Sequence, residues 1–319
     1  MTEAQPLHSR IEVLLERVGR VVIGQDDVLR HMLVALLAGG HALLEGVPGT
    51  AKTLAVRALA RTLDLRFGRI QFTPDLMPSD LVGVSVLNRT EGTFQYRQGP
   101  VFTDLLLADE INRAPAKTQS ALLEAMEERH VTVDGTTRPL PAPFTVYATQ
   151  NPVEYEGTYP LPEAQLDRFL LKIDVGYPAE AAERAVLDLY ADGFDAQDLA
   201  ESGLVPVFSG AELGELRVRT AAVHVEPRIR DYITQIVRVT RAEPVFSLGA
   251  SPRAGVALFL AARAEALLNG RDFVTPDDVK ALSFPVLRHR VLLTPEAEVE
   301  GIAPDDRLRS LLESLEAPR

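Results

Sequence analysis

The feature that most constrains how this chain folds is a glycine-rich loop between a predicted strand and a predicted helix. The loop reads Gly46-Val47-Pro48-Gly49-Thr50-Ala51-Lys52-Thr53 and follows the apolar run Ala42–Glu45. The helical pattern after it has an apolar side made of Leu54, Val56, Leu59, Leu63 and Leu65. Glycines let backbone N–H groups turn toward phosphate oxygens, and the first turn of a helix adds a positive dipole end. The order strand, loop, helix therefore predicts a phosphate-binding loop in an α/β fold.

Residues Gly46 through Leu54 are the expected nucleotide contacts. Lys52 has the charge and length to reach β- and γ-phosphates, and the Thr53 hydroxyl is the expected Mg²⁺ ligand. Ala51 departs from the usual loop pattern, which has glycine before the lysine. We expect a right-handed backbone at Ala51, which alanine tolerates, so the departure should cost little. The alternative interpretation, a chance glycine-rich turn, is disfavoured by the flanking strand and helix.

A pair of carboxylates, Asp109-Glu110, follows the apolar run Leu105–Ala108. Two carboxylates at the tip of a buried strand are costly unless a cation or ligand is present. We expect Asp109 to hold the Mg²⁺ shell and Glu110 to polarise a water for attack on the γ-phosphate. Two solvated carboxylates on a loop are the alternative, which the phosphate loop in the same chain weakens.

Short apolar runs alternate with helical patterns up to about Val175, which indicates an α/β fold with a largely parallel sheet. The candidate strands are Ala42–Glu45, Arg69–Thr73, Leu105–Ala108, Phe144–Ala148 and Leu170–Val175. The third and fourth are almost uninterrupted apolar runs, as expected of strands covered on both faces. Between Val82 and Phe102, two alternating segments flank a turn at Asn88–Gly92, which predicts an inserted β-hairpin over about 82–102.

The remainder of the chain is predicted to be helical. Tyr177-Pro178 indicates a boundary between a nucleotide-binding domain, 1–177, and a helical domain, 178–319. A helix over 179–190 is followed by a looser stretch over 191–210. Further helices are expected from Pro227 to Arg241, after Ser251-Pro252 with Ser251 as N-cap, and after Thr275-Pro276 with Thr275 as N-cap in the same way.

Three polar residues outside the first two motifs are candidates for the same chemistry. Asn151 follows the strand 144–148, where an amide could orient the attacking water, although Asn before Pro is most often a turn. Arg168 is compatible with a surface ion pair or with an arginine finger that acts on a neighbouring subunit's nucleotide. Arg253 lies in the first turn of a helix, where a cation opposes the dipole and needs an anion, either a phosphate or a nearby carboxylate.

Composition excludes several classes of function. The chain has 319 residues and no cysteine, so disulfides, thiolate metal sites and cysteine nucleophiles are absent. The six histidines lack metal-ligand spacing, which disfavours a zinc or haem enzyme. The net charge of −12 disfavours a general nucleic-acid binder. We find no signal-peptide pattern and no apolar stretch long enough to cross a bilayer, and expect a cytoplasmic protein.

Five stretches of the chain together carry a family resemblance. They are Ile23-Gly24-Gln25, the phosphate loop, Ala108–Glu128, Ala148–Phe169 and Gly249–Ala254. Together they resemble the MoxR family of AAA+ ATPases, almost from end to end. The resemblance implies a P-loop αβα nucleotide-binding domain with a hairpin insert, a C-terminal α-helical lid, and a homo-hexameric ring with ATP and Mg²⁺ between subunits.

The resemblance also implies roles for individual residues. Asn151 corresponds to sensor 1, Arg253 to sensor 2 and Arg168 to the arginine finger. Sensor 2 would close with its lid over the nucleotide of its own subunit. Val22, Ile23 and Gly24 resemble the segment that lies along the adenine.

By resemblance, the chain is an ATP-hydrolysing remodelling motor for protein clients. Such proteins work with partners that carry a von Willebrand factor A domain, in the maturation or metal loading of client complexes. Three alternatives stay open. A helicase-like nucleic-acid motor is disfavoured by the charge and by a hairpin with only Arg89 and Arg97 as cations. A magnesium-chelatase-like motor subunit is disfavoured by the short lid and the MoxR-like stretch after Asp109. A non-hydrolysing scaffold is disfavoured by Glu110.

Overall fold

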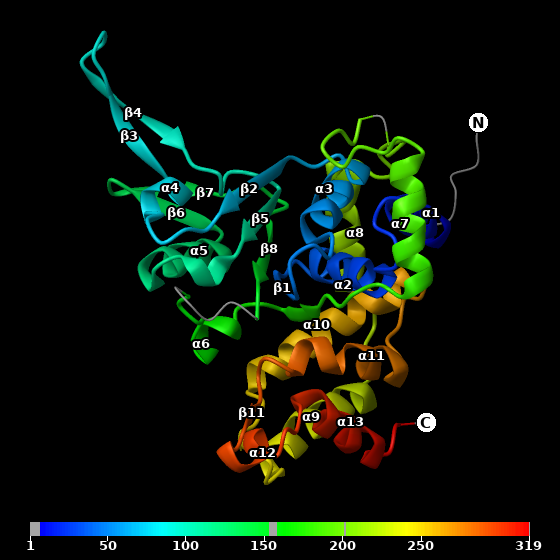
Figure 1. The fold of residues 1–319 in the computed structure, drawn as a ribbon. Coiled ribbons are helices and arrows are strands. Elements are labelled where there is room, and N and C mark those ends of the chain that lie inside the picture. Colours follow the sequence, from blue (N-terminus) through cyan, green and yellow to red (C-terminus); the bar gives the residue numbers. More distant parts are fainter. Residues whose placement is uncertain (1–6, 153–157, 201, 319) are drawn as a thin grey trace.

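The computed structural model describes residues 7–152, 158–200 and 202–318 (Figure 1). Its centre is a five-stranded, all-parallel sheet with the strand order β2-β5-β8-β1-β9. The strands are β1 (Ala42–Glu45), β2 (Phe67–Gln71), β5 (Leu105–Asp109), β8 (Thr145–Gln150) and β9 (Leu171–Asp174). All five predicted strands are present, and β2 begins two residues earlier than expected.

Helices cover both faces of this sheet. On β5, which lies between β2 and β8, Leu107 belongs to the hydrophobic cluster shared with α1, α2 and α3, while its neighbour Leu106 belongs to the cluster shared with α4 and α5. Successive side chains of a strand point to opposite faces, so a strand buried on both sides is apolar throughout. The helices of this part are α1 (Leu7–Gly19), α2 (Asp26–Leu37), α3 (Lys52–Thr62), α4 (Pro78–Val82), η1 (Ile111–Arg113), α5 (Ala116–Glu128) and α6 (Glu163–Leu166).

Two hairpins extend from this αβα layer. The predicted insert is confirmed as β3 (Gly83–Asn88) and β4 (Thr93–Gln98), an antiparallel pair that projects from the body of the molecule (Figure 1). A second hairpin, β6 (His130–Val133) with β7 (Thr136–Pro139), was not expected from the sequence. Its strands are four residues each and largely polar, too short for alternation to be recognised.

The chain after β9 is mostly helical, as expected. It forms α7 (Glu180–Ala191), α8 (Gly210–Ala222), α9 (Pro227–Ala242), β10 (Phe246–Leu248), α10 (Pro252–Leu268), α11 (Pro276–Leu287), β11 (Leu292–Leu293), α12 (Pro295–Val299) and α13 (Pro304–Ser314). The antiparallel pairing of β10 with β11 corrects the expectation of helices alone. Thr275 caps α11 by accepting a hydrogen bond from Asp278 N, as predicted. Ser251 occupies the N-cap of α10, but its side chain makes no cap bond.

Part of this second half packs on the first. Arg57 and Arg61 of α3 donate to the carbonyls of Ala196 and Leu204, at 2.9 and 2.8 Å. Val207 N donates to Thr62 O at 2.7 Å. The irregular stretches 194–200 and 202–208 therefore pack over α3, and the boundary expected after Tyr177 stays a prediction.

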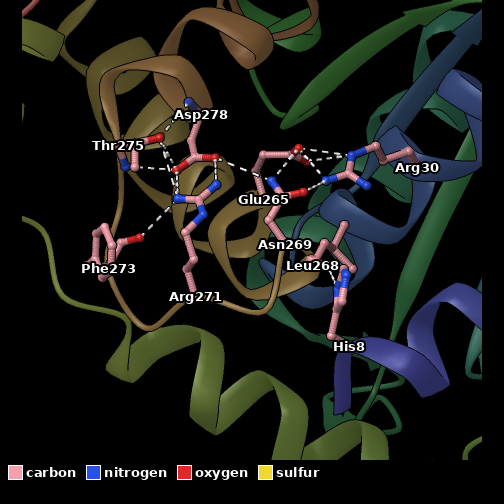
Figure 2. Close-up of polar contacts among 9 residues, drawn as sticks. All are labelled: His8, Arg30, Glu265, Leu268, Asn269, Arg271, Phe273, Thr275 and Asp278. Carbon is pink, nitrogen blue, oxygen red and sulfur yellow. Dashed lines mark hydrogen bonds and ion pairs between the residues drawn. The ribbon is translucent and has the colours of Figure 1, made fainter. Parts of the chain in front are cut away.

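A polar network around the buried carboxylates Glu265 and Asp278 links α10 and α11 to α2 (Figure 2). Arg30 of α2 pairs with Glu265 of α10 at 2.6 Å and also donates to Asn269, and Asn269 reaches Asp278. Arg271 closes the far end with two bonds to Asp278, at 2.5 and 2.6 Å. Burial opposes the charged form of Asp278, but hydrogen bonds from Arg271 and Thr275 outweigh it and hold the pKa of this carboxyl below its usual value. Removing Arg271 would leave the buried charge of Asp278 without its ion-pair partner, which is strongly destabilising.

Among the residues that the structure describes, no helix combines the length and the apolar character that crossing a membrane requires.

Candidate nucleotide site

A cavity of about 710 Å³ opens where β1, β5 and β8 end. Ligands of open α/β sheets bind at the carboxyl ends of the strands. The side chains expected to handle a nucleotide meet there. The cavity is lined by the loop residues Gly46, Pro48, Gly49, Thr50, Ala51, Lys52, Thr53 and Leu54 and by the polar residues Asp109, Glu110, Thr149, Gln150 and Asn151.

Two glycines of the loop are required by its shape. A Cβ on Gly46 would lie 2.2 Å from the carbonyl oxygen of Val175, the residue that follows β9, so any side chain would separate β1 from its neighbour. Gly49 has φ = +85°, a conformation that side chains rarely adopt. The loop therefore curls tightly between β1 and α3, with the first turn of α3 directed into the cavity.

Ala51 contradicts the expectation of a right-handed backbone. Its φ and ψ are 61° and 18°, in the left-handed region, and it precedes the first residue of α3. This conformation costs an L-residue roughly 1–2 kcal/mol and costs glycine almost nothing. The usual pattern has glycine at this position, and glycine adopts the left-handed conformation without strain. Alanine does not, so the backbone at Ala51 is strained beside Lys52.

Replacing Ala51 by glycine should raise the free energy of unfolding by about 0.5–1 kcal/mol, after allowance for the greater chain entropy of unfolded glycine. Thermal unfolding measures the change as a small rise in Tm. Ala58→Gly is the matched control, because Ala58 lies inside α3, where glycine is unfavourable, and its Tm should fall. A fall in Tm for both variants would contradict the strain at Ala51.

Lys52 lies close to both carboxylates. Its Nζ donates to the carbonyls of Gly46 and Val47, at 2.8 and 2.6 Å, and so turns toward the inside of the loop. Burial lowers the pKa of Lys52, and the charges of Asp109 and Glu110 oppose that shift. A partly desolvated ammonium, inward amides, a hydroxyl on Thr53 and a carboxylate on Asp109 form a donor set that suits a magnesium-bound triphosphate.

Asp109 is held at the end of β5 by neighbours on both sides. Thr149 of β8 donates to Oδ1 at 2.6 Å, and Arg69 of β2 pairs with Oδ2 at 2.7 Å. The Thr149 hydroxyl also accepts from Glu110 N at 2.8 Å. Thr149 therefore links the two carboxylate positions to the strand that leads to Asn151.

Glu110 adopts a left-handed backbone with φ = 56°, an uncommon conformation for a residue with a side chain. Gln71 donates to Oε2 at 2.5 Å, and Arg113 pairs with the same oxygen at 2.9 Å. The turn after β5 directs this carboxylate into the cavity, and the two donors hold it there. Non-glycine residues in this conformation occur disproportionately at functional sites.

Asn151 lies where the sequence predicts. It follows β8, which is paired with β1 on one side and β5 on the other, and it is buried in the cavity wall. The phosphate loop and the Asp109-Glu110 pair are therefore its immediate neighbours along the edge of the sheet.

Of the three residues expected along the adenine, Val22, Ile23 and Gly24, only Ile23 lines the cavity. Ile23 lines the cavity, together with Val21 and Gln25. Val22 is buried in the core, and a Cβ on Gly24 would lie 2.7 Å from Ala182 of α7, so these two face away from the cavity. Other residues of the cavity wall were not expected at the site from the sequence, namely Tyr177, Glu183, Val186, Leu189, Tyr190 and Phe194.

Arg168 and Arg253 are not part of this cavity. They line a second cavity of about 230 Å³ that shares no lining residue with the first. Gly40 and His41, just before β1, line the second cavity, whereas Gly46, just after β1, lines the first. The four residues of β1, roughly 13 Å at about 3.3 Å each, therefore separate the two cavities.

A single carboxylate brings the two arginines together. Glu127 of α5 pairs with Arg168 at 3.0 Å and with Arg253 at 3.3 Å. Arg253 therefore does not lie at the nucleotide cavity of its own subunit in this structure, and its closing over that nucleotide stays a prediction. Sequence spacing does not tell on which side of the sheet α10 packs, and α10 packs against α2, near the start of β1.

Fold and cavity together define a P-loop ATPase with a helical lid, the AAA+ class. Residues 41–171 match the ATPase family associated with various cellular activities (AAA), and residues 238–311 match the AAA lid domain. The chain is 48% identical to protein YeaC of Bacillus subtilis (strain 168), with 100% of this chain and 98% of that protein aligned. It is 45% identical to the chaperone MoxR1 of Mycobacterium tuberculosis, with 99% and 84% aligned.

Among solved structures, a candidate ATPase from Cytophaga hutchinsonii superposes with a TM-score of 0.89 at 43% sequence identity, covering 98% of this chain and 96% of that one. The chain belongs to the MoxR family of AAA+ ATPases, and it is an ATPase.

Proposed function

We propose that the chain is the ATP-hydrolysing subunit of a homo-hexameric ring in which each nucleotide is shared by two neighbours. The observation that carries this proposal is the separation of the two cavities at opposite ends of β1. One subunit offers the phosphate loop, the carboxylates and Asn151 at one end, and Arg168 with Arg253 at the other. Arginines that lie away from the nucleotide cavity of their own subunit can take part in hydrolysis only at a neighbour's nucleotide.

Within the nucleotide cavity we assign each residue one task. Lys52 and the amides of the loop hold the β- and γ-phosphates, and Thr53 and Asp109 hold Mg²⁺. The ion supplies charge neutralisation between the phosphates. Glu110 accepts a proton from the attacking water, while Asn151 orients that water. Ile23 and the α7 wall enclose the base.

The client and the partner are inferred from the family. A relative named as a chaperone at 45% identity supports remodelling of protein clients. A partner with a von Willebrand factor A domain, and a role in the maturation or metal loading of client complexes, are the finer parts of the proposal. The charge of −12 further supports protein clients over nucleic acid.

Affinity capture with the Glu110→Gln variant tests this function. The variant should hold ATP without hydrolysing it, so clients and a von Willebrand factor A protein should accumulate on it when ATP is present. Mass spectrometry of the captured proteins makes the measurement, and Lys52→Ala, which should not bind ATP, is the matched control.

Equal capture by the two variants would contradict an ATP-dependent remodeller. If the variant captures nucleic acid, and nuclease treatment releases the captured proteins along with it, the helicase-like motor would be favoured instead.

A further inference from the structure

The loop that carries Arg168 is attached to the lid mainly through the buried side chain of Arg290. Arg290 follows α11 and is 3% exposed. Its guanidinium donates to Asp167 Oδ1 at 2.6 Å and to the carbonyls of Asp167, Phe169 and Leu170 at 3.2, 2.6 and 3.1 Å. A further bond of 2.5 Å returns to Val286 O within the lid.

These contacts use the whole hydrogen-bonding capacity of Arg290. A guanidinium has five N–H donors, and the five bonds take up one donor on Nε and two on each Nη. Four of the five bonds hold residues on either side of Arg168. Arg290 has no donor left for a phosphate, so its contribution is to place the loop.

A second lid residue holds the same loop. His289 is buried, and burial keeps its pKa well below the usual histidine value, so the ring is neutral. Its Nε2 lies 3.1 Å from Phe169 O, a carbonyl that can only accept, so Nε2 carries the proton and donates. The loop is therefore fixed by two neighbouring residues of the lid.

We propose that Arg290 is a positioning residue that fixes Arg168 for the neighbouring subunit's nucleotide and makes the Arg168 loop move with the lid. The proposal rests on the trans-acting role of Arg168 given above. Arg253 lies on the lid as well and meets Arg168 at Glu127 of α5, so the lid contacts the surroundings of Arg168 through this carboxylate in addition to Arg290. A change in lid position at one subunit then alters the catalytic arginines offered to the next.

The Arg290→Lys variant tests this. Lysine retains the positive charge facing Asp167 but lacks the planar fork that holds three carbonyls at once. A shift of about 1 Å at a catalytic group costs on the order of 10²-fold in rate, so we expect kcat to fall between about 10- and 100-fold. Binding of a fluorescent ATP analogue should not change, because the nucleotide cavity lies at the other end of β1.

Subunit mixing separates positioning from general damage. When a trace of Arg290→Lys protein is mixed with excess Glu110→Gln protein, each Arg290→Lys subunit has Glu110→Gln neighbours. These neighbours cannot hydrolyse ATP, but they supply correctly placed arginines to the nucleotide of the Arg290→Lys subunit. The turnover of each Arg290→Lys subunit should therefore equal that of a wild-type subunit diluted in the same way. Arg168→Ala should be rescued equally. Arg288→Lys is the matched control, since Arg288 pairs with Asp174 and Asp305, outside the Arg168 loop, and should lose little activity.

Asp167→Asn is the second variant, for the case that Arg290→Lys does not assemble. It weakens one of the four bonds to the loop and should show a smaller loss of kcat with the same rescue. Rescue of Arg168→Ala without rescue of the Arg290 and Asp167 variants would overturn the positioning role. Full activity of Arg168→Ala would instead overturn the shared nucleotide site itself.

Discussion

Glu110→Gln should lose nearly all ATP turnover and keep its affinity for ATP. A positioned general base contributes about 10²–10⁴-fold to rate, and an amide cannot accept the proton of the attacking water. In the wild-type protein, Gln71 and Arg113 hold the Glu110 carboxylate. The amide of the variant has the same shape, and its oxygen can accept hydrogen bonds from the same two residues. Steady-state phosphate release and equilibrium binding of a fluorescent ATP analogue measure the two properties separately.

Lys52→Ala is the contrasting variant. It removes the ammonium that faces the inside of the phosphate loop, so binding itself should fail. Comparable loss of binding in the two variants would show that Glu110 belongs to the nucleotide's binding set and that the general base lies elsewhere.

Arg168→Ala should bind ATP normally and hydrolyse it poorly. An arginine that stabilises the charge on a neighbour's γ-phosphate is worth ~10³–10⁵ in rate, and Arg168 is remote from its own nucleotide cavity. For the same reason, the specific activity of the wild-type protein should rise with concentration as the ring forms. Phosphate release at a series of protein concentrations, beside sedimentation of the same samples, measures both effects.

Mixed rings give the second half of this test. Arg168→Ala added to wild-type protein should lower activity by more than dilution, because each mixed ring contains interfaces without an arginine. An equal mixture with Lys52→Ala should restore little, since most interfaces would still lack one element. Specific activity that does not depend on concentration, and that Arg168→Ala leaves unchanged, would contradict the ring and leave only the nucleotide cavity.

The nucleotide cavity could be predicted because its parts are local in the sequence. Gly46, Lys52 and Thr53 lie in one loop, and Asp109 and Asn151 each follow an apolar strand. The carboxyl ends of parallel strands meet at one edge of the sheet, so such residues converge whatever the strand order. The same local reasoning correctly predicted the hairpin at 83–98 and the cap at Thr275.

Other parts depend on information that spacing does not contain. The contact between Gln71 and Glu110 requires β2 to lie beside β5, and the order of strands in a sheet cannot be predicted from the sequence of any single strand. The left-handed backbone of Ala51 is imposed by the folded loop, whereas the residue type alone predicted a right-handed backbone. The place of Arg253 follows from how α10 packs on α2, which is decided by tertiary contacts between helices of similar apolar character.

The continuous hydrophobic cluster has a thermodynamic consequence. Leu29 and Met32 of α2 belong to the same cluster as Leu258 and Ala261 of α10, and the cluster extends as far as α13. Elements that bury one another's apolar surface lose that stabilisation together, so we expect the sheet layer and the lid to unfold in a single thermal transition. On this expectation the lid does not unfold separately from the sheet layer, and a fragment without the lid would expose the apolar face of α2 to water.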